Sequence, residues 1–389
     1  QMCIRDSFDS YEETVEKTAF LIQDAIKRQM VSDVPICTFL SGGVDSSVVS
    51  AVCAAELKKQ GKKLTTFSFD FIDNDKYFKA NSFQPSQDRP YVDKMVSFLD
   101  SDHHYLECDN KMQADLLYRS VDAHDLPCMA DIDSSLQYFC EEVSHSHKVV
   151  LTGECADEVF GGYPWFHREE MLNSGTFPWT PSLTPRKVLL KDDLVKSLHM
   201  DEYVKKIYDR SVSEINVLPS ENEIETNRRR IGYLNIRFFM QTLLNRMDRT
   251  SMFSGLEARV PFADRKLVDY VFNIPWEMKA KDGLVKNILR QASKGLLPDE
   301  ILFRRKSPYP KTYNPYYENL LAKRLKEVLS DSASPLHSLL DLKQVTQFLE
   351  NPKDYGAPWY GQLMAGPQMI AYLLQIEYFL RKYNVSIRI

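Results

Sequence analysis

The sequence predicts an α/β fold in which a doubly wound, mostly parallel sheet is followed by a large helical half. Short apolar runs alternate with helical patterns through the first 152 residues, which is typical of a parallel sheet. Two of these runs end in turns rich in glycine, serine or acidic residues. Beyond Gly162 the sequence holds helical patterns and proline-rich stretches, so the sheet is expected to be complete there.

The first elements form a βαβ unit. A helix is predicted from Tyr11 to Met30, because apolar residues recur there at helical spacings after an acidic first turn. The apolar run Val34–Leu40 is predicted to be a strand buried on both faces. The alanine-rich segment Ser46–Lys59 is predicted to be a helix, and Leu64–Phe71 the second strand.

Two further strands are predicted at His103–Glu107 and Lys148–Thr152. Each follows a helical stretch, Pro90–Leu99 and Ser134–Ser144 respectively, so the alternation continues.

The chain is divided into four parts on this basis. Residues 1–10 are interpreted as a leader or truncation scar, and Cys3 is therefore left out of functional reasoning. Residues 11–170 form the sheet core, 171–230 an irregular and helical excursion, and 231–389 the helical half. Helices are predicted in the last two parts at Arg228–Ser254, Asp264–Phe272 and Met369–Tyr383.

The composition excludes several classes of protein. The 389 residues include 49 Lys and Arg against 54 Asp and Glu, a net charge of −5, and 43% are hydrophobic, which argues against disorder. No basic surplus supports a nucleic-acid partner, and no apolar run is long enough for a membrane span. The seven scattered cysteines form no Cys-x-x-Cys pair, which argues against a disulfide framework and a zinc site. Without a secretory signal, a cytoplasmic location is predicted.

The heptapeptide Ser41–Ser47 (SGGVDSS) lies between a buried strand and a helix start, where free backbone N–H groups favour an anion such as phosphate. Its glycines permit close backbone approach, and Asp45 could hold Mg²⁺ against phosphate oxygens. A plain tight turn is the alternative for the glycine pair. The heptapeptide is neither a Walker A loop nor a dinucleotide fingerprint.

A second run, Leu151–Tyr163 (LTGECADEVFGGY), follows the strand that ends at Thr152. Ligand sites of open α/β sheets lie at such carboxyl ends. Its three carboxylates, Glu154, Asp157 and Glu158, could complete an Mg²⁺ shell or serve acyl chemistry. The alternative is a solvated, acidic helix start.

The heptapeptide resembles the pyrophosphate loop of the N-type ATP pyrophosphatases, which cleave ATP between the α and β phosphates. The second run is similar to the signature of asparagine synthetases and the related β-lactam synthetases. The segments Asn245–Asp264 and Lys286–Arg290 extend the resemblance, which covers about residues 12–383.

The resemblance implies ATP as co-substrate, Mg²⁺ as cofactor, and a set of site residues. Lys286 would be the catalytic lysine at the α-phosphate, and Glu154 would position or deprotonate ammonia. Asp157 would be the third catalytic residue. Asp45 and Asp157 would hold the metal. The ATP and pyrophosphate site would comprise Leu40, Ser41, Gly42, Gly43, Asp45, Ser46, Ser47, Phe69, Thr152, Gly153, Arg305 and Lys306. Asp131, Ser134 and Ser135 are assigned to aspartate binding.

Several residues keep a structural alternative. Lys286 could be an exposed lysine at a helix start, and the basic run Arg304–Lys306 could reach pyrophosphate or face water. A buried ion-pair network supporting the site is predicted for Arg246, Asp248, Glu257 and Arg259. Cys155 stands where the family commonly has glycine, so a positive φ would strain it. It is interpreted as a tolerated variant and not as a nucleophile.

The function implied by the resemblance is ATP-dependent amidation of aspartate through a β-aspartyl-AMP intermediate. The expected partners are aspartate, ATP and ammonia, with the ammonia free or supplied by a glutaminase domain in a longer chain or in trans. A homodimer is possible. The alternatives are β-lactam-forming cyclisation of an acyl-adenylate and a non-catalytic nucleotide-binding scaffold.

Overall fold

The computed structural model describes residues 9–80, 84–352 and 365–387. Its centre is a five-stranded sheet in the order β3-β2-β1-β4-β5, in which every neighbouring pair is parallel. The strands are β1 (Ile36–Phe39), β2 (Thr65–Phe71), β3 (Asp102–Cys108), β4 (Val149–Leu151) and β5 (Glu257–Arg259). The predicted α/β class and the first four strands are confirmed.

The expectation that the sheet is complete by Gly162 is wrong. The fifth strand, β5, comes almost one hundred residues later and pairs with β4, with Ala258 opposite Val150. It has three residues and begins and ends on a charged side chain, so it has neither the apolar run nor the alternation that predicts a strand. Its partner, and not its own sequence, places it in the sheet.

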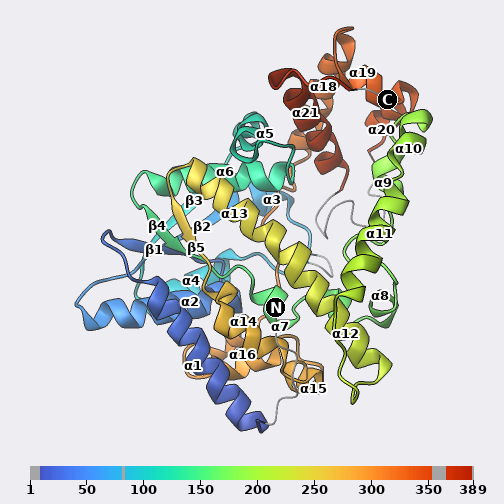
Figure 1. The fold of residues 1–389 in the computed structure, drawn as a ribbon. Helices are drawn as coiled ribbons and strands as arrows, with labels where there is room; N and C mark the ends of the chain where they lie inside the picture. The colour runs from blue at the N-terminus through green and yellow to red at the C-terminus, as the bar shows by residue number, and fades with distance from the viewer. Residues whose placement is uncertain (1–8, 81–83, 353–364, 388–389) are drawn as a thin grey trace.

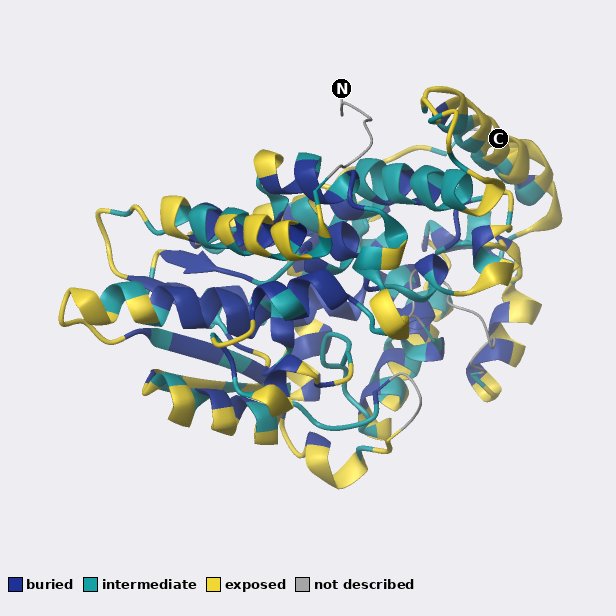
Figure 2. Cartoon of the chain, turned by 90° about the horizontal axis from the view of Figure 1, so that it is seen from below, coloured by how far each residue is buried: buried dark blue, intermediate teal, exposed yellow. Residues whose placement is uncertain are grey.

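The strand side chains alternate between two hydrophobic cores. Ile36 and Val149 belong to one core, whereas their neighbours Cys37 and Val150 belong to the other. This is the period-2 pattern of a sheet that is covered on both faces. The covered strands appear dark blue between helices with exposed outer sides in Figure 2.

Helices cover the two faces unequally. The first core is built from α1 (Tyr11–Gln29), α2 (Val44–Lys59), α4 (Arg89–Leu99), α14 (Arg265–Phe272), α16 (Asn287–Ala292) and α17 (Asp299–Leu302). The second core is closed by α6 (Asp131–Ser144) and α13 (Gln241–Phe253), with α5 (Asn110–His124) packed against α6. No helix was expected from the sequence at the position of α5. In Figure 1, α1, α14 and α16 lie on the side of the sheet opposite to α6.

The helical half extends away from the sheet. The helix predicted at Arg228–Ser254 is observed as α12 (Glu223–Leu234), a π-helical segment at Asn235–Met240, and α13. A separate hydrophobic cluster holds α18 (Pro315–Ser330), α19 (Leu336–Leu339), α20 (Leu342–Glu350) and α21 (Gly366–Lys382) against α5. These four helices lie at the upper right of Figure 1.

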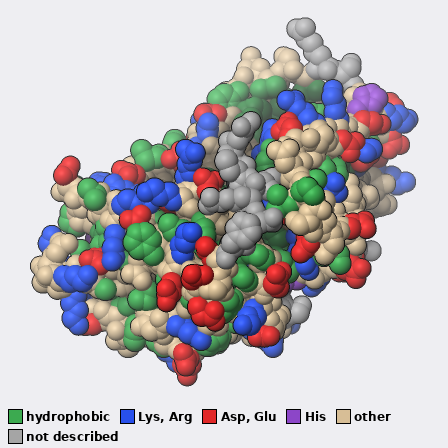
Figure 3. Space-filling model, turned by 60° about the horizontal axis from the view of Figure 1, so that its bottom comes forward, with side chains coloured by type: hydrophobic (Ala, Val, Ile, Leu, Met, Phe, Trp, Pro, Cys, Tyr) green, Lys and Arg blue, Asp and Glu red, His purple; other side chains and the backbone are tan. Residues whose placement is uncertain are grey.

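The remaining α-helices of the described residues lie in the connections between these elements. They are α3 (Asn74–Tyr77), α7 (Ala156–Phe160), α8 (Glu169–Leu172), α9 (Thr184–Lys187), α10 (Asp192–Leu198), α11 (Met200–Ser213) and α15 (Trp276–Lys279). Within the described ranges, no helix has the length and apolar character to cross a bilayer. On the face shown in Figure 3, Lys and Arg side chains are interspersed with Asp and Glu side chains, without a continuous basic area.

The strand order predicts where a ligand would bind. The chain moves from β1 outward to β2 and β3, then returns to the other side of β1 for β4 and β5. Ligands of doubly wound sheets bind at the carboxyl ends of the strands where this direction reverses. That position lies between β1 and β4, and the two motif loops follow these two strands.

Candidate active site

A cavity of about 320 Å³ lies at the carboxyl ends of β1, β2 and β4. Its lining includes ten of the residues that the sequence analysis assigned to the site: Leu40, Ser41, Asp45, Ser46, Phe69, Thr152, Gly153, Glu154, Asp157 and Lys306. The tertiary structure therefore brings together residues that lie up to 266 positions apart in the chain, from Leu40 to Lys306.

The loop after β1 is organised around two serine side chains. Ser46 Oγ lies 3.0 Å from Ser41 Oγ and accepts a hydrogen bond from the Ser41 backbone N–H at 3.1 Å. The N-cap residue of the 16-residue helix α2 is Gly43, which has no side chain to accept a hydrogen bond from the first backbone amides. Free N–H groups and the positive helix end make this loop suitable for a phosphate.

Two glycines allow the loops to approach each other. Gly42 has φ +68°, and an added Cβ would lie 2.6 Å from Tyr91 Cβ on α4. At Gly153, in the loop after β4, an added Cβ would lie 2.4 Å from the Ser46 backbone nitrogen. No side chain fits there, so the β4 loop and the start of α2 are in direct backbone contact.

Lys286 lies at the centre of a buried charge cluster. Its Nζ contacts Asp45 Oδ2 at 2.6 Å and Asp157 Oδ1 at 2.6 Å, and only 2% of the side chain is exposed. Lys306 Nζ contacts Asp157 Oδ2 at 2.8 Å and lies over the ring of Tyr163. Lys286 is therefore not the exposed lysine that the structural alternative describes.

The cluster contains two carboxyl groups and two ammonium groups. Burial raises the pKa of Asp45, although the charge of Lys286 opposes the rise. Burial opposes the ionised form of Asp157, but attraction to Lys286 and Lys306 lowers the pKa of this carboxyl. Burial likewise disfavours the charged Lys286, but the two aspartates raise its pKa. The two aspartates thus favour the charged form of Lys286, which lies next to carboxylate oxygens of the kind that Mg²⁺ prefers.

Glu154 forms a second ion pair on the other side of the loop. Its Oε1 accepts a hydrogen bond from Arg246 Nη2 at 2.5 Å, and Arg246 also lies near Asp133. Glu154 Oε2 has no hydrogen-bond partner among the described residues. Burial raises the pKa of Glu154, although Arg246 opposes the rise. A carboxyl with a raised pKa and a free oxygen is suited to proton transfer.

The predicted ion-pair network is confirmed for Arg246, which is buried and pairs with Glu154. The pair between Arg259 and Glu257 is different, because Glu257 is 53% exposed and the pair lies at the edge of the sheet. Arg259 also donates to the backbone oxygens of Gln29 and Val31, so it ties the end of α1 to β5.

Aromatic side chains form the apolar wall of the cavity. Phe69 stacks on Tyr309, with ring centroids 6.1 Å apart, and also contacts Phe139. Such a wall suits a planar ring system, since aromatic pairs prefer stacked or edge contacts. Tyr309 was not among the residues predicted from the sequence.

Other predicted residues lie outside the cavity lining. Gly42, Gly43 and Ser47 are in the loop and the first turn of α2, and Arg305 is exposed. Ser134 and Ser135 donate to the backbone oxygens of Asp131 and Ile132 within their own helix. Asp131 accepts a hydrogen bond from Gln368 on α21 at 2.8 Å. Aspartate binding by these three residues stays a prediction.

Arg304 neither faces water nor lines the cavity, the two alternatives considered for the basic run, but belongs to a buried pair behind the loop. Arg304 Nη1 donates to the Ser41 backbone oxygen at 3.0 Å, and its Nη2 contacts Asp88 at 2.6 Å. The guanidinium also stacks over the ring of Tyr91. In the basic run, Arg304 is thus buried behind the loop, whereas Lys306 lines the cavity. No local pattern distinguishes these neighbours.

Cys155 has φ +70°, the left-handed conformation that the sequence analysis identified as a source of strain. Its side chain is buried, and burial, followed by repulsion from Glu158 and Glu154, raises the pKa of the thiol well above the ordinary range. His167 Nε2 donates a hydrogen bond to the Gly161 backbone oxygen at 2.8 Å, so this nitrogen does not act as a base toward the thiol. Cys155 therefore lacks the thiolate character of a nucleophile.

Comparisons with known proteins show what the whole chain is similar to. The sequence model of the asparagine synthase family matches residues 17–381. Asparagine synthetase (glutamine-hydrolyzing) 3 of Bacillus subtilis is 49% identical over 381 residues, which cover 97% of this chain and 62% of that protein. Asparagine synthetase (glutamine-hydrolyzing) 1 of the same organism is 27% identical, over 87% of this chain and 56% of that protein. The chain thus spans about three fifths of the length of these relatives.

Proposed function

Because the chain belongs to the asparagine synthase family, we propose that this site makes asparagine from aspartate, ATP and ammonia. In the first step the β-carboxylate of aspartate attacks the α-phosphorus of ATP, forming β-aspartyl-AMP and releasing pyrophosphate. In the second step ammonia attacks the acyl carbon, the bond to AMP breaks, and a proton leaves the nitrogen. The observation that carries the proposal is the meeting of the two motif loops with Lys286.

The chain's own residues account for the first step. The amides at the start of α2 and the hydroxyls of Ser41 and Ser46 bind the pyrophosphate, whose negative charge grows as it leaves. Lys286 supplies a fixed positive charge where the α-phosphoryl group reacts. Since Asp45 and Asp157 hold this ammonium from both sides, it needs little reorganisation during the reaction.

The donor set fits Mg²⁺. Asp45 and Asp157 line the cavity, and their carboxylate oxygens contact the ammonium groups of Lys286 and Lys306. Such hard oxygen ligands suit this ion. Bound there, Mg²⁺ would neutralise charge on the phosphates of ATP.

Glu154 serves the second step. Its free Oε2 and its raised pKa allow it to hold ammonia by a hydrogen bond and to accept the proton that the nitrogen loses. Arg246 fixes the orientation of this carboxylate through Oε1. The ammonia is free in solution or is delivered from glutamine by a glutaminase domain in the same longer chain or in trans.

The test is to incubate the purified chain with aspartate, Mg·ATP and ammonium and to measure AMP, pyrophosphate and asparagine. We expect all three products in equal amounts, and none when aspartate is omitted. Asp45→Asn is expected to abolish pyrophosphate release. Pyrophosphate release with a carboxyethyl-amino acid but not with aspartate would indicate β-lactam formation instead. ATP binding without any turnover would indicate a non-catalytic scaffold.

A further inference from the structure

A second cavity, of about 570 Å³, lies on the other side of Arg246. It is lined by the connection between α5 and α6 and by residues of α13 and α21. Among the described lining residues, Arg246 is the one that the two cavities share. Apart from Arg246, the titratable groups in its wall have no part in the reaction proposed above.

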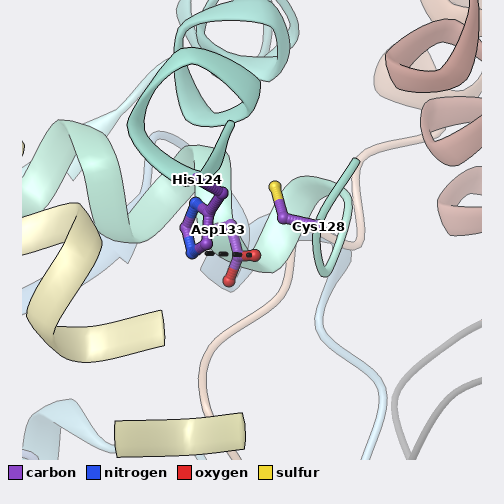
Figure 4. Close-up of side chains that lie close together, drawn as sticks. All are labelled: His124, Cys128 and Asp133. Atoms are coloured by element: carbon purple, nitrogen blue, oxygen red, sulfur yellow. Dashed lines mark ion pairs between the residues drawn. The ribbon is translucent and has the colours of Figure 1, made fainter. Parts of the chain in front are cut away.

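Three of these groups gather at one corner of the cavity. His124 ends α5, Cys128 lies in the connection, and Asp133 is in the first turn of α6. One ligand atom from each, a ring nitrogen, Sγ and a carboxylate oxygen, lies within 4.8 Å of the other two. Figure 4 shows the three side chains side by side, with the contact between His124 and Asp133 dashed.

The ring of His124 is oriented for a ligand. Its Nδ1 lies 2.9 Å from the Ser120 backbone oxygen, which can only accept a hydrogen bond, so Nδ1 carries a proton. In the neutral ring Nε2 then presents a lone pair. This atom is buried without a hydrogen-bond partner among the described residues, and it faces Asp133 Oδ2 at 3.9 Å. A cation between these atoms would satisfy both.

The other two side chains are also held by their surroundings. The Met129 backbone N–H donates to Asp133 Oδ2 at 2.6 Å, and Gln375 Nε2 donates to Cys128 Sγ at 3.1 Å. Asp133 Oδ1 is buried and has no hydrogen bond among the described residues, since Arg246 Nε lies 4.0 Å away. Groups that orient metal ligands in this way are typical of protein metal sites.

We propose that His124, Cys128 and Asp133 bind Zn²⁺, with a water from the cavity as fourth ligand. The proposal differs from the prediction made from cysteine spacing, which considered only Cys-x-x-Cys pairs. Imidazole, thiolate and carboxylate are the three ligand types of zinc, whereas a thiolate disfavours Mg²⁺. The thiolate and the carboxylate together match the double charge of the ion. With zinc–ligand bonds of about 2.0–2.3 Å, the donor atoms draw together by about 1 Å from their separations here.

A catalytic dyad of Cys128 and His124 is the competing interpretation. Burial, followed by repulsion from Asp133, raises the pKa of the Cys128 thiol well above the ordinary range, which is the opposite of an activated nucleophile. Zinc displaces the thiol proton, so binding releases a proton and strengthens as the pH rises. Asp133 also lies beside Arg246, and Arg246 pairs with Glu154. A zinc ion bound by Asp133 would therefore lie one residue away from the ion pair of the first cavity.

The experiment uses the full chain after removal of metals with a chelator. Zn²⁺ binding is measured by competition with a chromophoric chelator, and Co²⁺ is added to a separate sample as a spectroscopic probe. We expect one strong zinc site per chain and a thiolate-to-cobalt charge-transfer absorption. Cys128→Ala and His124→Gln are each expected to weaken zinc binding more than about tenfold.

Matched controls separate the site from the other thiols and imidazoles of the chain. Cys53→Ala removes a buried cysteine of α2, and His145→Gln removes an exposed histidine, and both are expected to bind zinc like the parent chain. Equal zinc affinity in all four variants would overturn the proposal. So would a Co²⁺ complex of the parent chain without thiolate absorption, a result that does not depend on any variant folding.

Discussion

The ammonium of Lys286 lies 2.6 Å from the carboxylate of Asp45, although 241 positions separate these residues in the chain. Asp45 is in the first turn of α2, and Lys286 caps α16 in a left-handed conformation, with φ +56°. The pair joins the phosphate loop to the helical half. The same lysine reaches Asp157 after β4, so one side chain holds three separate segments at the reacting centre.

We expect Lys286→Ala to reduce aspartate-dependent pyrophosphate release by at least about 100-fold, because it removes the fixed charge at the α-phosphate. It also leaves two buried carboxylates with less compensation, so the thermal unfolding temperature should fall. Lys294→Ala is the matched control, since this lysine is exposed and lies just beyond α16. Near-normal pyrophosphate release in Lys286→Ala would contradict the assignment.

Glu154→Gln is expected to separate the two chemical steps. The amide can no longer accept a proton, but the phosphate loop and Lys286 are untouched. Aspartate-dependent pyrophosphate release should therefore continue, while the asparagine formed per pyrophosphate falls. Both products are measured in the same reaction. A parallel loss of both would show that Glu154 acts before the second step.

The two loop glycines should differ in their tolerance of a methyl group. Gly153→Ala places Cβ 2.4 Å from the Ser46 backbone nitrogen, so it should lower the free energy of unfolding by about 1–3 kcal/mol. In Gly43→Ala the new Cβ has only one near neighbour, Ser41 Oγ at 3.5 Å, and the change should be within about 1 kcal/mol. Denaturant unfolding of both variants measures the difference. Equal stability would mean that the loops are not in close contact.

Cys155→Ala should retain aspartate-dependent pyrophosphate release at nearly the parent rate. The thiol is buried and its pKa is raised, so it does not supply a nucleophile. A small loss of stability is expected from the missing sulfur contacts. The measurement is the rate of pyrophosphate release together with the unfolding temperature. Loss of the reaction in a folded variant would contradict this assignment and indicate that the thiol takes part in the reaction.

Asp131 should make stability depend on pH. Burial raises the pKa of this carboxyl to about 6, against about 3.9 in an unfolded chain. Between these values the folded state binds more protons, so its contribution to stability is greatest below pH 4 and declines until about pH 6. The total decline is about 3 kcal/mol, from the difference of about two pKa units.

Asp131→Asn keeps a hydrogen-bond acceptor for Gln368 but removes this ionisation. We expect the variant to lack the decline and to be more stable than the parent at pH 7, by up to about 3 kcal/mol. Urea unfolding at pH 4, 5, 6 and 7 compares the two chains. Identical pH profiles would contradict the prediction. A raised KM for aspartate in the variant would support the substrate role assigned from the sequence.

The sequence alone predicted the fold class, four strands and the two motif loops, because each depends on local pattern. Buried parallel strands are continuous apolar runs, and the heptapeptide Ser41–Ser47 follows the first of them directly. The resemblance to asparagine synthetases identified Lys286. No local pattern could show that its side chain is only 2% exposed and that its ammonium lies between two carboxylates.

The tertiary structure decided the rest, because the deciding contacts join segments far apart in the chain. The strand β5 exists through its pairing with β4, and Arg304 differs from Arg305 only because Asp88 and Ser41 lie beside it. The sequence by itself determined which chemical groups are available. Long-range packing determined which of them lost water and gained a charged partner, and these two effects set their pKa values and their roles.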